Sequence, residues 1–297
     1  MAEGCAWVDG SYVPISEARI PILEAGFLRS DVTYDVVAVW RGKFFRLEDH
    51  LGRFETACRA IRLKPPLPRA EIREILLEVV RRSELRDAYV EMIVSRGVPS
   101  PGQRDLRGFQ PRFYAYAIPY VSIAGSDQPR PGTDVIIARD VRRTSPGAID
   151  PTVKNFQWGD FTRGLLEAYD RGAWLPILTD GDGKITEGPG FNVLVVADGG
   201  LHTPARGVLL GITRRTVVEI AREDGLDVEV HDVRTSLLYR ADEIFLTSTA
   251  GGVIPVATLD GEPVGRRCPG PITARIREKY WAWHDDPRFA TPVDYAA

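Results

Sequence analysis

A polar stretch from Ser122 to Thr133 divides the chain into two parts, each of which contains periodic apolar segments. The stretch reads SIAGSDQPRPGT, is rich in turn-forming residues and has neither helical nor strand periodicity. At roughly 150 residues per domain, the length of 297 residues points to two domains. We therefore expect an N-terminal α/β domain over residues 1–121, an interdomain linker over 122–133 and a C-terminal α/β domain over 134–297.

The composition excludes several classes of protein. Hydrophobic residues make up 44% and charged residues 27%, so a disordered or collagen-like chain is excluded. The 38 basic and 41 acidic residues give a formal net charge of −3. The chain therefore lacks the excess of positive charge that indicates binding to nucleic acid or to an anionic membrane. No apolar run approaches the ~20 residues that span a bilayer, and the first residues lack the basic and apolar parts of a signal peptide. We expect a cytoplasmic protein that binds neither nucleic acid nor a membrane.

Cysteine and histidine usage gives no sign of a metal centre. The three cysteines are scattered and odd in number, which fits neither a disulfide framework nor a C-x-x-C pair. The four histidines have no H-x-x-x-H or H-E-x-x-H spacing. We therefore expect no metal. These residues are Cys5, Cys58 and Cys268, and His50, His202, His231 and His284.

Apolar spacing predicts the regular elements. In the first part it predicts strands over 6–9 and 12–15, a hairpin of 36–40 and 43–47, helices over 48–63 and from Pro68, and strands over 88–95 and 112–120. In the second part it predicts a strand over 134–139, a helix over 160–171, a two-stranded unit of 175–179 and 191–197, a helix opening at Gly211 and a strand over 243–247. The segment 181–184 matches no phosphate-binding or calcium loop and is expected to be a turn.

Four places can carry chemistry. Lys154 lies among apolar and amide residues, where an amine can act as a nucleophile toward an aldehyde. Gly211-Ile212-Thr213 offers a hydroxyl and backbone N–H groups to an anion at a helix N-terminus, although it can equally be a simple cap. The Ser248–Gly252 turn is a second possible anion nest. Glu187, before a Gly-Pro-Gly turn, can instead be a solvated carboxylate.

Taken together and in this order, these motifs resemble the fold-type IV pyridoxal-phosphate enzymes. That group contains the branched-chain and D-amino-acid aminotransferases and aminodeoxychorismate lyase. The resemblance runs from about Ile22 to Val256 and rests on five segments, namely 45–53 (FRLEDHLGR), Lys154-Asn155, 186–192 (TEGPGFN), 211–214 (GITR) and 248–252 (STAGG). It implies an α/β (α+β) fold of two mixed α/β domains with the cofactor between them, and a homodimer.

The resemblance also implies roles for the cofactor-binding residues. Lys154 would hold pyridoxal 5'-phosphate as a Schiff base and would move the proton during the reaction. Glu187 would keep the pyridine nitrogen protonated by its negative charge. Arg53 would bind the phosphate through the N–H groups of its planar guanidinium. Ile212 and Thr213, by backbone and hydroxyl, and Thr249 would complete the phosphate site.

The first-domain strands depart from the best-known members in the residues that would face the substrate. The run 34–38 reads YDVVA where branched-chain enzymes typically show FEGIR, so Ala38 stands for the expected arginine. Glu91 stands on the strand where D-amino-acid enzymes place basic residues, and a carboxylate there would repel a substrate carboxylate. The pattern is similar to the (R)-selective amine transaminases. The expected substrate residues are Arg29, Tyr34, Val36, Ala38, Tyr89, Glu91 and Ala250, although Tyr34 and Tyr89 can simply pack the strand face.

A keto acid acceptor such as pyruvate would still need a cation. The loop 97–108 carries Arg104 and Arg107, and members of this subgroup resemble one another in using a mobile arginine there. Spacing does not decide between the two residues, and both can be solvated loop charges. The expected activity is a ping-pong transfer of an amino group from a primary (R)-amine to a keto acid. The alternatives are a branched-chain or D-amino-acid aminotransferase, an aminodeoxychorismate lyase, and a non-catalytic cofactor carrier.

Overall fold

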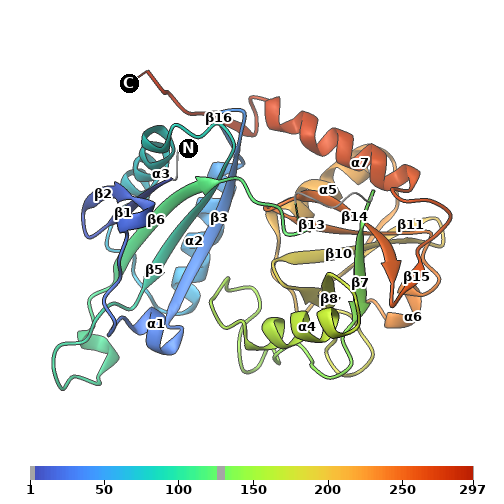
Figure 1. Ribbon diagram of the computed structural model, residues 1–297, viewed down its shortest axis with the longest axis horizontal. Coiled ribbons are helices and arrows are strands. Elements are labelled where there is room, and N and C mark those ends of the chain that lie inside the picture. Colours follow the sequence, from blue (N-terminus) through green and yellow to red (C-terminus); the bar gives the residue numbers. More distant parts are fainter. Residues whose placement is uncertain (1–3, 126–130, 297) are drawn as a thin grey trace. The chain divides into compact units, whose positions relative to one another are not determined.

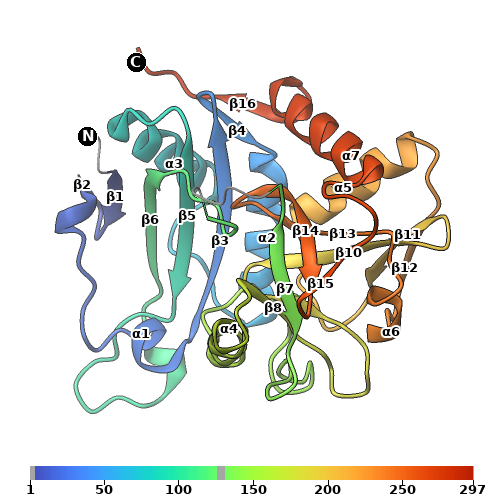
Figure 2. The same ribbon diagram turned by 45° about the vertical axis from the view of Figure 1, so that its right-hand side comes forward.

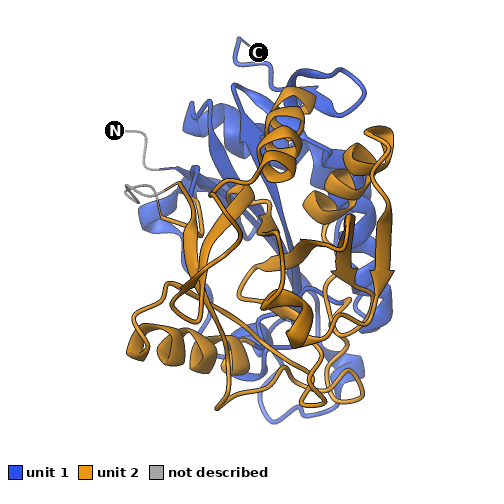
Figure 3. Ribbon diagram, turned by 90° about the vertical axis from the view of Figure 1, so that its right-hand side faces the viewer, with its two compact units in different colours: residues 1–121, 153–157, 284–297 blue, residues 122–152, 158–283 orange. Residues whose placement is uncertain are grey.

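The computed structural model describes residues 4–125 and 131–296. The chain forms two compact units, shown in different colours in Figure 3. The first comprises Met1–Val121, Val153–Gln157 and His284–Ala297, and the second Ser122–Thr152 and Trp158–Trp283. Residues 126–130 of the expected linker lie outside the described residues.

This division differs from the expected one in three segments. The described residues of the expected linker group with the second unit. Residues 153–157, which include Lys154, group with the first unit, because the backbone N–H of Tyr34 and the hydroxyl of Thr33 both donate to the Lys154 carbonyl, at 3.1 and 2.7 Å. The chain from His284 onward also joins the first unit, since its strand pairs with residues 43–45.

The first unit is built on an antiparallel sheet with the strand order β16-β4-β3-β5-β6-β1-β2. Its strands are β1 (Cys5–Val8), β2 (Ser11–Pro14), β3 (Val32–Trp40), β4 (Lys43–Phe45), β5 (Ala88–Ser95), β6 (Arg112–Pro119) and β16 (Ala290–Pro292). The predicted hairpin of β3 and β4 is confirmed. Arg41 and Gly42 both have positive φ, at 49° and 76°, as the common two-residue hairpin turn requires.

Two long helices pack on one face of this sheet (Figure 1). They are α2 (Leu47–Ala60) and α3 (Arg69–Ser83). The predicted apolar stripe of α3 is buried, and that of α2 is buried except for Ile61, which lies just beyond the helix and is half-buried. The short elements are η1 (Ile15–Glu17), α1 (Ala25–Arg29), η2 (Leu106–Gly108) and η3 (Trp283–Asp285). The core of the unit lies between the helices and one set of alternate strand residues, which include Val37, Val39, Val90 and Met92. Residues 34, 36, 38, 89 and 91 therefore lie on the opposite face of the sheet.

The second unit contains a mixed sheet with the strand order β12-β11-β10-β13-β14-β7-β8 (Figure 2). Two further short strands, β9 and β15, pair with β10 and β14. The strands are β7 (Thr133–Ile137), β8 (Leu175–Ile177), β9 (Glu187–Gly188), β10 (Phe191–Ala197), β11 (Gly200–Pro204), β12 (Val228–His231), β13 (Glu243–Ser248), β14 (Gly252–Leu259) and β15 (Glu262–Pro263). The helices are α4 (Gly159–Asp170), α5 (Ile212–Glu223), α6 (Thr235–Leu238) and α7 (Pro271–Ala282).

One prediction for this unit is wrong. The segments 175–179 and 191–197 do not form a two-stranded unit, because β8 pairs in parallel with β7 and β10 lies between β11 and β13. Both segments are buried on their two faces, so they carry no alternation from which a pairing partner could be inferred. The turn at 181–184 is confirmed, since the Asp180 N–H donates to the Lys184 carbonyl at 3.0 Å. Across the described residues, no helix is both long and apolar enough to cross a membrane.

Candidate functional site

Lys154 lies beside the edge of β3, in the short loop segment that joins the first unit. Its carbonyl is fixed by Thr33 and Tyr34, while its ammonium group lies 4.3 Å above the centre of the Tyr34 ring. The Phe156 ring packs against the Tyr34 ring, with 4.7 Å between the two ring centroids. Residues of β3 thus contact both the backbone carbonyl and the ammonium group of Lys154.

Five of the expected substrate residues lie together on the sheet face opposite the helices. The registers of β3 and β5 place Val36 opposite Glu91 and Ala38 opposite Tyr89, and Tyr34 lies two residues before Val36 on the same face. Glu91 also lies opposite Tyr116 of β6. Tyr34, Val36, Ala38 and Glu91 are all about 5% exposed. The structure therefore brings these β3 and β5 residues into one patch.

Glu91 is the acidic centre of this patch. The hydroxyls of Tyr116 and Tyr89 both donate to its Oε2, at 2.7 and 3.1 Å. Burial raises the pKa of Glu91, and the two phenol hydrogen bonds and the charge of Lys154 offset this rise only in part. Burial also raises the pKa of both tyrosines, and the carboxylate raises it further. Tyr116 was not predicted as a site residue. The available signal was its spacing of two residues from Tyr114, which places both tyrosines on one face of the half-buried strand β6.

A second acidic group lies on the helix-covered face of the same sheet. Asp35 of β3 accepts two hydrogen bonds from Arg53, at 2.7 and 2.8 Å, and lies 2.8 Å from Nδ1 of His50. Burial opposes ionisation of Asp35, but the charge and hydrogen bonds of Arg53 and the hydrogen bond of His50 prevail and lower its pKa. Burial lowers the pKa of His50. Sequence analysis assigned Arg53 and missed its two partners, although His50 and Arg53 are spaced to share one helix face.

The three expected arginines outside the sheet have exposed side chains. Arg29 ends α1, with its guanidinium 6.0 Å from the centre of the Phe109 ring. Arg107 forms a bidentate ion pair with Asp105 in the same loop and is 90% exposed. Arg104 is exposed as well. The structure places both loop arginines at the surface.

In the second unit, Glu187 is a buried carboxylate held from two sides. Arg143 donates to Oε1 through Nε and Nη2, at 3.2 and 3.1 Å, and the Leu209 N–H donates to Oε2 at 2.8 Å. Arg143 is itself fixed by Asp160 at 2.6 Å. The alternative of a solvated turn carboxylate is therefore wrong for Glu187, which is 4% exposed. Sequence analysis missed Arg143 and Asp160, because they lie 44 and 27 residues away along the chain and no motif links them to Glu187.

The N-terminus of α5 is suited to an anion. Gly211 is the N-cap and has no side chain, so no side-chain cap satisfies the first backbone N–H groups, and Thr213 lies in the first turn. A Cβ at Gly211 would lie 2.1 Å from Oδ1 of Asn192, so a larger residue would displace the buried Asn192 side chain. Arg214 is buried in the same turn, with hydrogen bonds to Thr203 and to the Pro204 carbonyl, and burial lowers its pKa.

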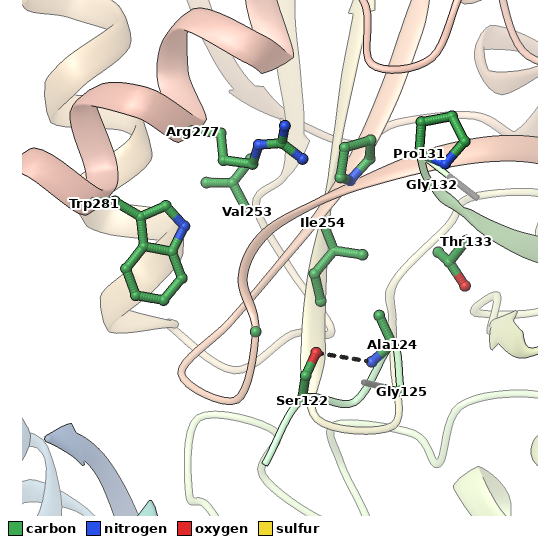
Figure 4. Close-up of a pocket in the computed structure, with 12 residues that line it drawn as sticks. Ser122, Ala124, Gly125, Pro131, Gly132, Thr133, Val253, Ile254, Arg277 and Trp281 are labelled. Carbon is green, nitrogen blue, oxygen red and sulfur yellow. Dashed lines mark hydrogen bonds between the residues drawn. The ribbon is translucent and has the colours of Figure 1, made fainter. Parts of the chain in front are cut away.

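The second expected anion nest is the turn after β13. The Ala250 N–H donates to Ser248 at 3.1 Å, and Gly251 and Gly252 have positive φ of 135° and 67°. A cavity of about 350 Å³ lies next to this turn. Its lining includes Val253 and Ile254, together with Arg277 and Trp281 of α7 (Figure 4). Gly251 lines this cavity, whereas Thr213 and Thr249 are absent from its described lining. We therefore do not assign it to the expected phosphate site.

These groups fit the chemistry of pyridoxal phosphate. The cofactor needs an amine for its aldehyde, an anion for its pyridinium and N–H or hydroxyl donors for its phosphate. The chain offers Lys154, the rigidly held carboxylate of Glu187, and a helix N-terminus whose N-cap contributes no side chain.

Comparison with known proteins agrees with this chemistry. Residues 33–259 match the family model of amino-transferase class IV. A putative branched-chain-amino-acid aminotransferase of Methanocaldococcus jannaschii is 30% identical over 276 residues, which cover 92% of this chain and 94% of that protein. A D-alanine aminotransferase of Bacillus licheniformis is 30% identical over 271 residues, covering 91% and 93%.

Solved structures show the same fold. The branched-chain amino acid aminotransferase of Thermobaculum terrenum, solved in its PLP form, has a TM-score of 0.86 and 26% identity, covering 98% of this chain and 99% of that one. The Escherichia coli branched-chain enzyme has a TM-score of 0.90, with 26% identity and coverage of 98% and 100%. The expected mixed α/β fold of type IV is confirmed. The chain therefore belongs to the class IV aminotransferases, whose cofactor is pyridoxal 5'-phosphate.

Proposed function

We propose that this aminotransferase moves an amino group from a primary (R)-amine without an α-carboxylate to a keto acid such as pyruvate. The observation that carries the proposal is the patch around Glu91. A donor carboxylate needs a cation or several N–H donors, whereas this patch presents a carboxyl group and two phenols that already donate to it. In either protonation state, Glu91 supplies no positive charge. The family resemblance supports the same assignment.

Lys154 is the proposed catalytic residue. When bound, pyridoxal phosphate supplies an aldehyde and an electron-withdrawing ring. The Lys154 amine holds the cofactor and, once displaced by the donor amine, carries the proton away from the donor carbon. Its position supports this role, because β3 fixes the lysine backbone and the Tyr34 ring contacts the ammonium group.

Glu187 is proposed to face the pyridine nitrogen and keep it protonated. The carboxylate must stay ionised and fixed to do this. Arg143 and the Leu209 N–H hold both of its oxygens, and Asp160 balances the charge of Arg143. We infer that Arg143 and Asp160 are positioning residues for Glu187.

The phosphate is proposed to bind the N-terminus of α5 through Ile212 and Thr213, with Thr249 and Arg53 as further donors. The absence of a side chain at the N-cap and the α5 dipole support the first pair. Arg53 donates to Asp35 through Nε and Nη2, at 2.7 and 2.8 Å, which fixes the guanidinium. Asp35 would then orient Arg53.

The remaining proposed substrate residues have separate tasks. Tyr34, Val36, Ala38 and Tyr89 would shape the space for the donor's organic groups, together with Ala250 and Arg29. Arg104 or Arg107 would bind the acceptor carboxylate. Their exposure supports a mobile role, and the bidentate bond between Arg107 and Asp105 leaves Arg104 the simpler choice.

Turnover of (R)-1-phenylethylamine with pyruvate tests the proposal. Formation of alanine and acetophenone in equal amounts, strongly reduced with the (S) enantiomer, would support it. Lys154→Ala should abolish turnover and the absorbance band of the Schiff base between lysine and cofactor. Lys184→Ala is the matched control, because that lysine pairs with Asp232 in a surface turn and should change neither property. Full activity of Lys154→Ala would contradict the lysine assignment.

The second candidate is a branched-chain or D-amino-acid aminotransferase. The names of the relatives favour it, since they include a branched-chain and a D-alanine aminotransferase at 30% identity. It predicts turnover of L-leucine or D-alanine and none of the simple amine. A lyase of the aminodeoxychorismate type would instead consume its substrate without a keto acceptor, and a cofactor carrier would show colour without turnover.

We also propose a homodimer. The segment from Ile20 to Leu28 exposes an unusual number of large apolar side chains for a monomer surface. Five of them are more than half exposed, namely Ile20, Ile22, Leu23, Phe27 and Leu28. Light scattering should give twice the 33.0 kDa chain mass, and Phe27→Glu should reduce it toward one chain.

A further inference from the structure

We propose that His202, Glu229 and His231 form a Zn²⁺ site on the second unit. The residues belong to β11 and β12, which pair in parallel with His202 opposite Glu229. His231 follows two residues after Glu229 and therefore lies on the same face of β12. Sequence spacing predicted no metal, because the two histidines are 29 residues apart and only the strand pairing brings them together.

The three ligand atoms have the separations that a tetrahedral cation requires. Nδ1 of His202 lies 3.1 Å from Nε2 of His231, and Oε2 of Glu229 lies 3.8 Å from each nitrogen. Zinc–ligand bonds of about 2.0–2.1 Å at tetrahedral angles separate neighbouring ligand atoms by about 3.3 Å. The two nitrogens are already close to that separation. Because the Glu229 side chain is 54% exposed, its carboxylate can close the remaining few tenths of an ångström.

A backbone contact prepares His202 for this role. Its Nε2 lies 3.1 Å from the Ala197 carbonyl, so Nε2 carries the proton and Nδ1 presents its lone pair. The His202 side chain is only 9% exposed, and strand pairing holds it. Without metal, the His231 Nε2–H donates to this lone pair. On metal binding, the neutral His231 ring carries its proton on Nδ1 instead, and the cation takes the position between the two nitrogens.

The chemistry of the donors selects the cation. Two imidazoles and one carboxylate suit Zn²⁺ and its neighbours in the first transition row, whereas Mg²⁺ prefers oxygen ligands alone. Water would fill the fourth position. Because β12 is the edge strand of its sheet, the cation would tie this edge to β11. The site is built from this unit alone and is separate from the residues proposed to bind pyridoxal phosphate.

Equilibrium dialysis of the holoenzyme against Zn²⁺, with metal analysis, tests the site. We expect one Zn²⁺ per chain, no comparable uptake of Mg²⁺, and a higher thermal midpoint with Zn²⁺. Glu229→Gln and His231→Ala should each weaken Zn²⁺ binding by about tenfold or more. Both residues lie on the partly exposed edge strand, so the variants should keep the cofactor's absorbance, which confirms folding. His202→Asn is less decisive because the residue is buried.

Glu262→Gln is the matched control, since it removes an exposed carboxylate from another short strand of the same sheet. It should bind Zn²⁺ as the wild type does. Bound Cu²⁺ should show splitting from two imidazole nitrogens in its electron paramagnetic resonance spectrum. In the His231→Ala variant, only the splitting from the His202 nitrogen should remain. Absence of Zn²⁺ uptake by the wild type, or equal uptake by the His231→Ala variant, would overturn the proposal.

Discussion

Asp35 and Glu91 are buried carboxyl groups on adjacent strands of one sheet, yet their surroundings drive their ionisation in opposite directions. Asp35 faces the helices and has Arg53 and His50 as partners, so its pKa is lowered. Glu91 faces the other way and has two phenols as hydrogen-bond partners, so burial prevails and its pKa is raised. The comparison shows that burial alone does not decide the state of a carboxyl group. In this sheet, the guanidinium of Arg53 pairs with Asp35 and lowers the pKa of that carboxyl group.

The largest expected effect comes from breaking the Asp35 cluster. Asp35→Asn removes the buried carboxylate that pairs with the half-buried Arg53 guanidinium and lies 2.8 Å from His50, which should lower the free energy of unfolding by about 3–5 kcal/mol. Urea denaturation of the cofactor-free protein measures this. Asp31→Asn is the matched control, because Asp31 forms a similar bidentate pair with Arg96 that is more exposed. An equal loss in both variants would show that the Asp35 cluster is no more important than a surface ion pair.

Reversing the charge at Glu91 should change the donor preference. Glu91→Arg supplies the cation that a donor carboxylate needs, and a hydrogen bond to a charged group is worth about 1.5–3 kcal/mol. The ratio of kcat/KM for D-alanine to that for (R)-1-phenylethylamine should therefore rise roughly ten- to hundredfold. Glu91→Gln, which removes the charge without adding a cation, should shift the ratio much less. An unchanged donor profile in the Glu91→Arg variant would contradict the proposed role of Glu91.

A smaller effect should come from the phenol that makes the shorter bond to Glu91. Tyr116→Phe removes the donor at 2.7 Å and should cost about 0.5–1.5 kcal/mol of stability, while raising the pKa of Glu91 further. Tyr89→Phe removes the longer bond, at 3.1 Å, and should have a weaker effect. Infrared titration of the carboxyl band, identified by its loss in Glu91→Gln, measures the pKa. The reverse order of the two variants would refute this reading of the geometry.

The smallest effect is a difference in pH dependence. A raised pKa means that the contribution of Glu91 to stability is present at acid pH and is lost as the pH rises through the raised value. Asp35 behaves in the opposite way, because its contribution is present above the usual aspartate pKa and is lost as the pH falls. Glu91→Gln should therefore gain stability relative to the wild type toward neutral pH, by on the order of 1 kcal/mol. Thermal midpoints across the acid range measure it, and a gain toward acid pH would contradict the sign.

Much of the fold and part of the site were predictable from the sequence. The strand over 88–95 and the helices of the first unit follow from apolar spacing, whereas the common face of the expected β3 and β5 residues follows from the strand register in the structure. Other contacts lie far apart in the sequence. Asp35 meets His50 and Arg53 only because α2 covers β3, and β8 pairs with β7 although the residues of β8 are buried throughout and show no alternation. Neither contact leaves a local pattern.

The most direct test of the proposed specificity is an acceptor-free titration of the cofactor-loaded protein, followed by visible absorbance. (R)-1-phenylethylamine, its (S) enantiomer, D-alanine and L-leucine are added separately, each at the same concentration. We predict that only the (R) amine bleaches the cofactor band strongly and that pyruvate restores it. Bleaching by D-alanine or L-leucine, with no response to the (R) amine, would contradict this prediction and would assign the chain to the amino-acid aminotransferases.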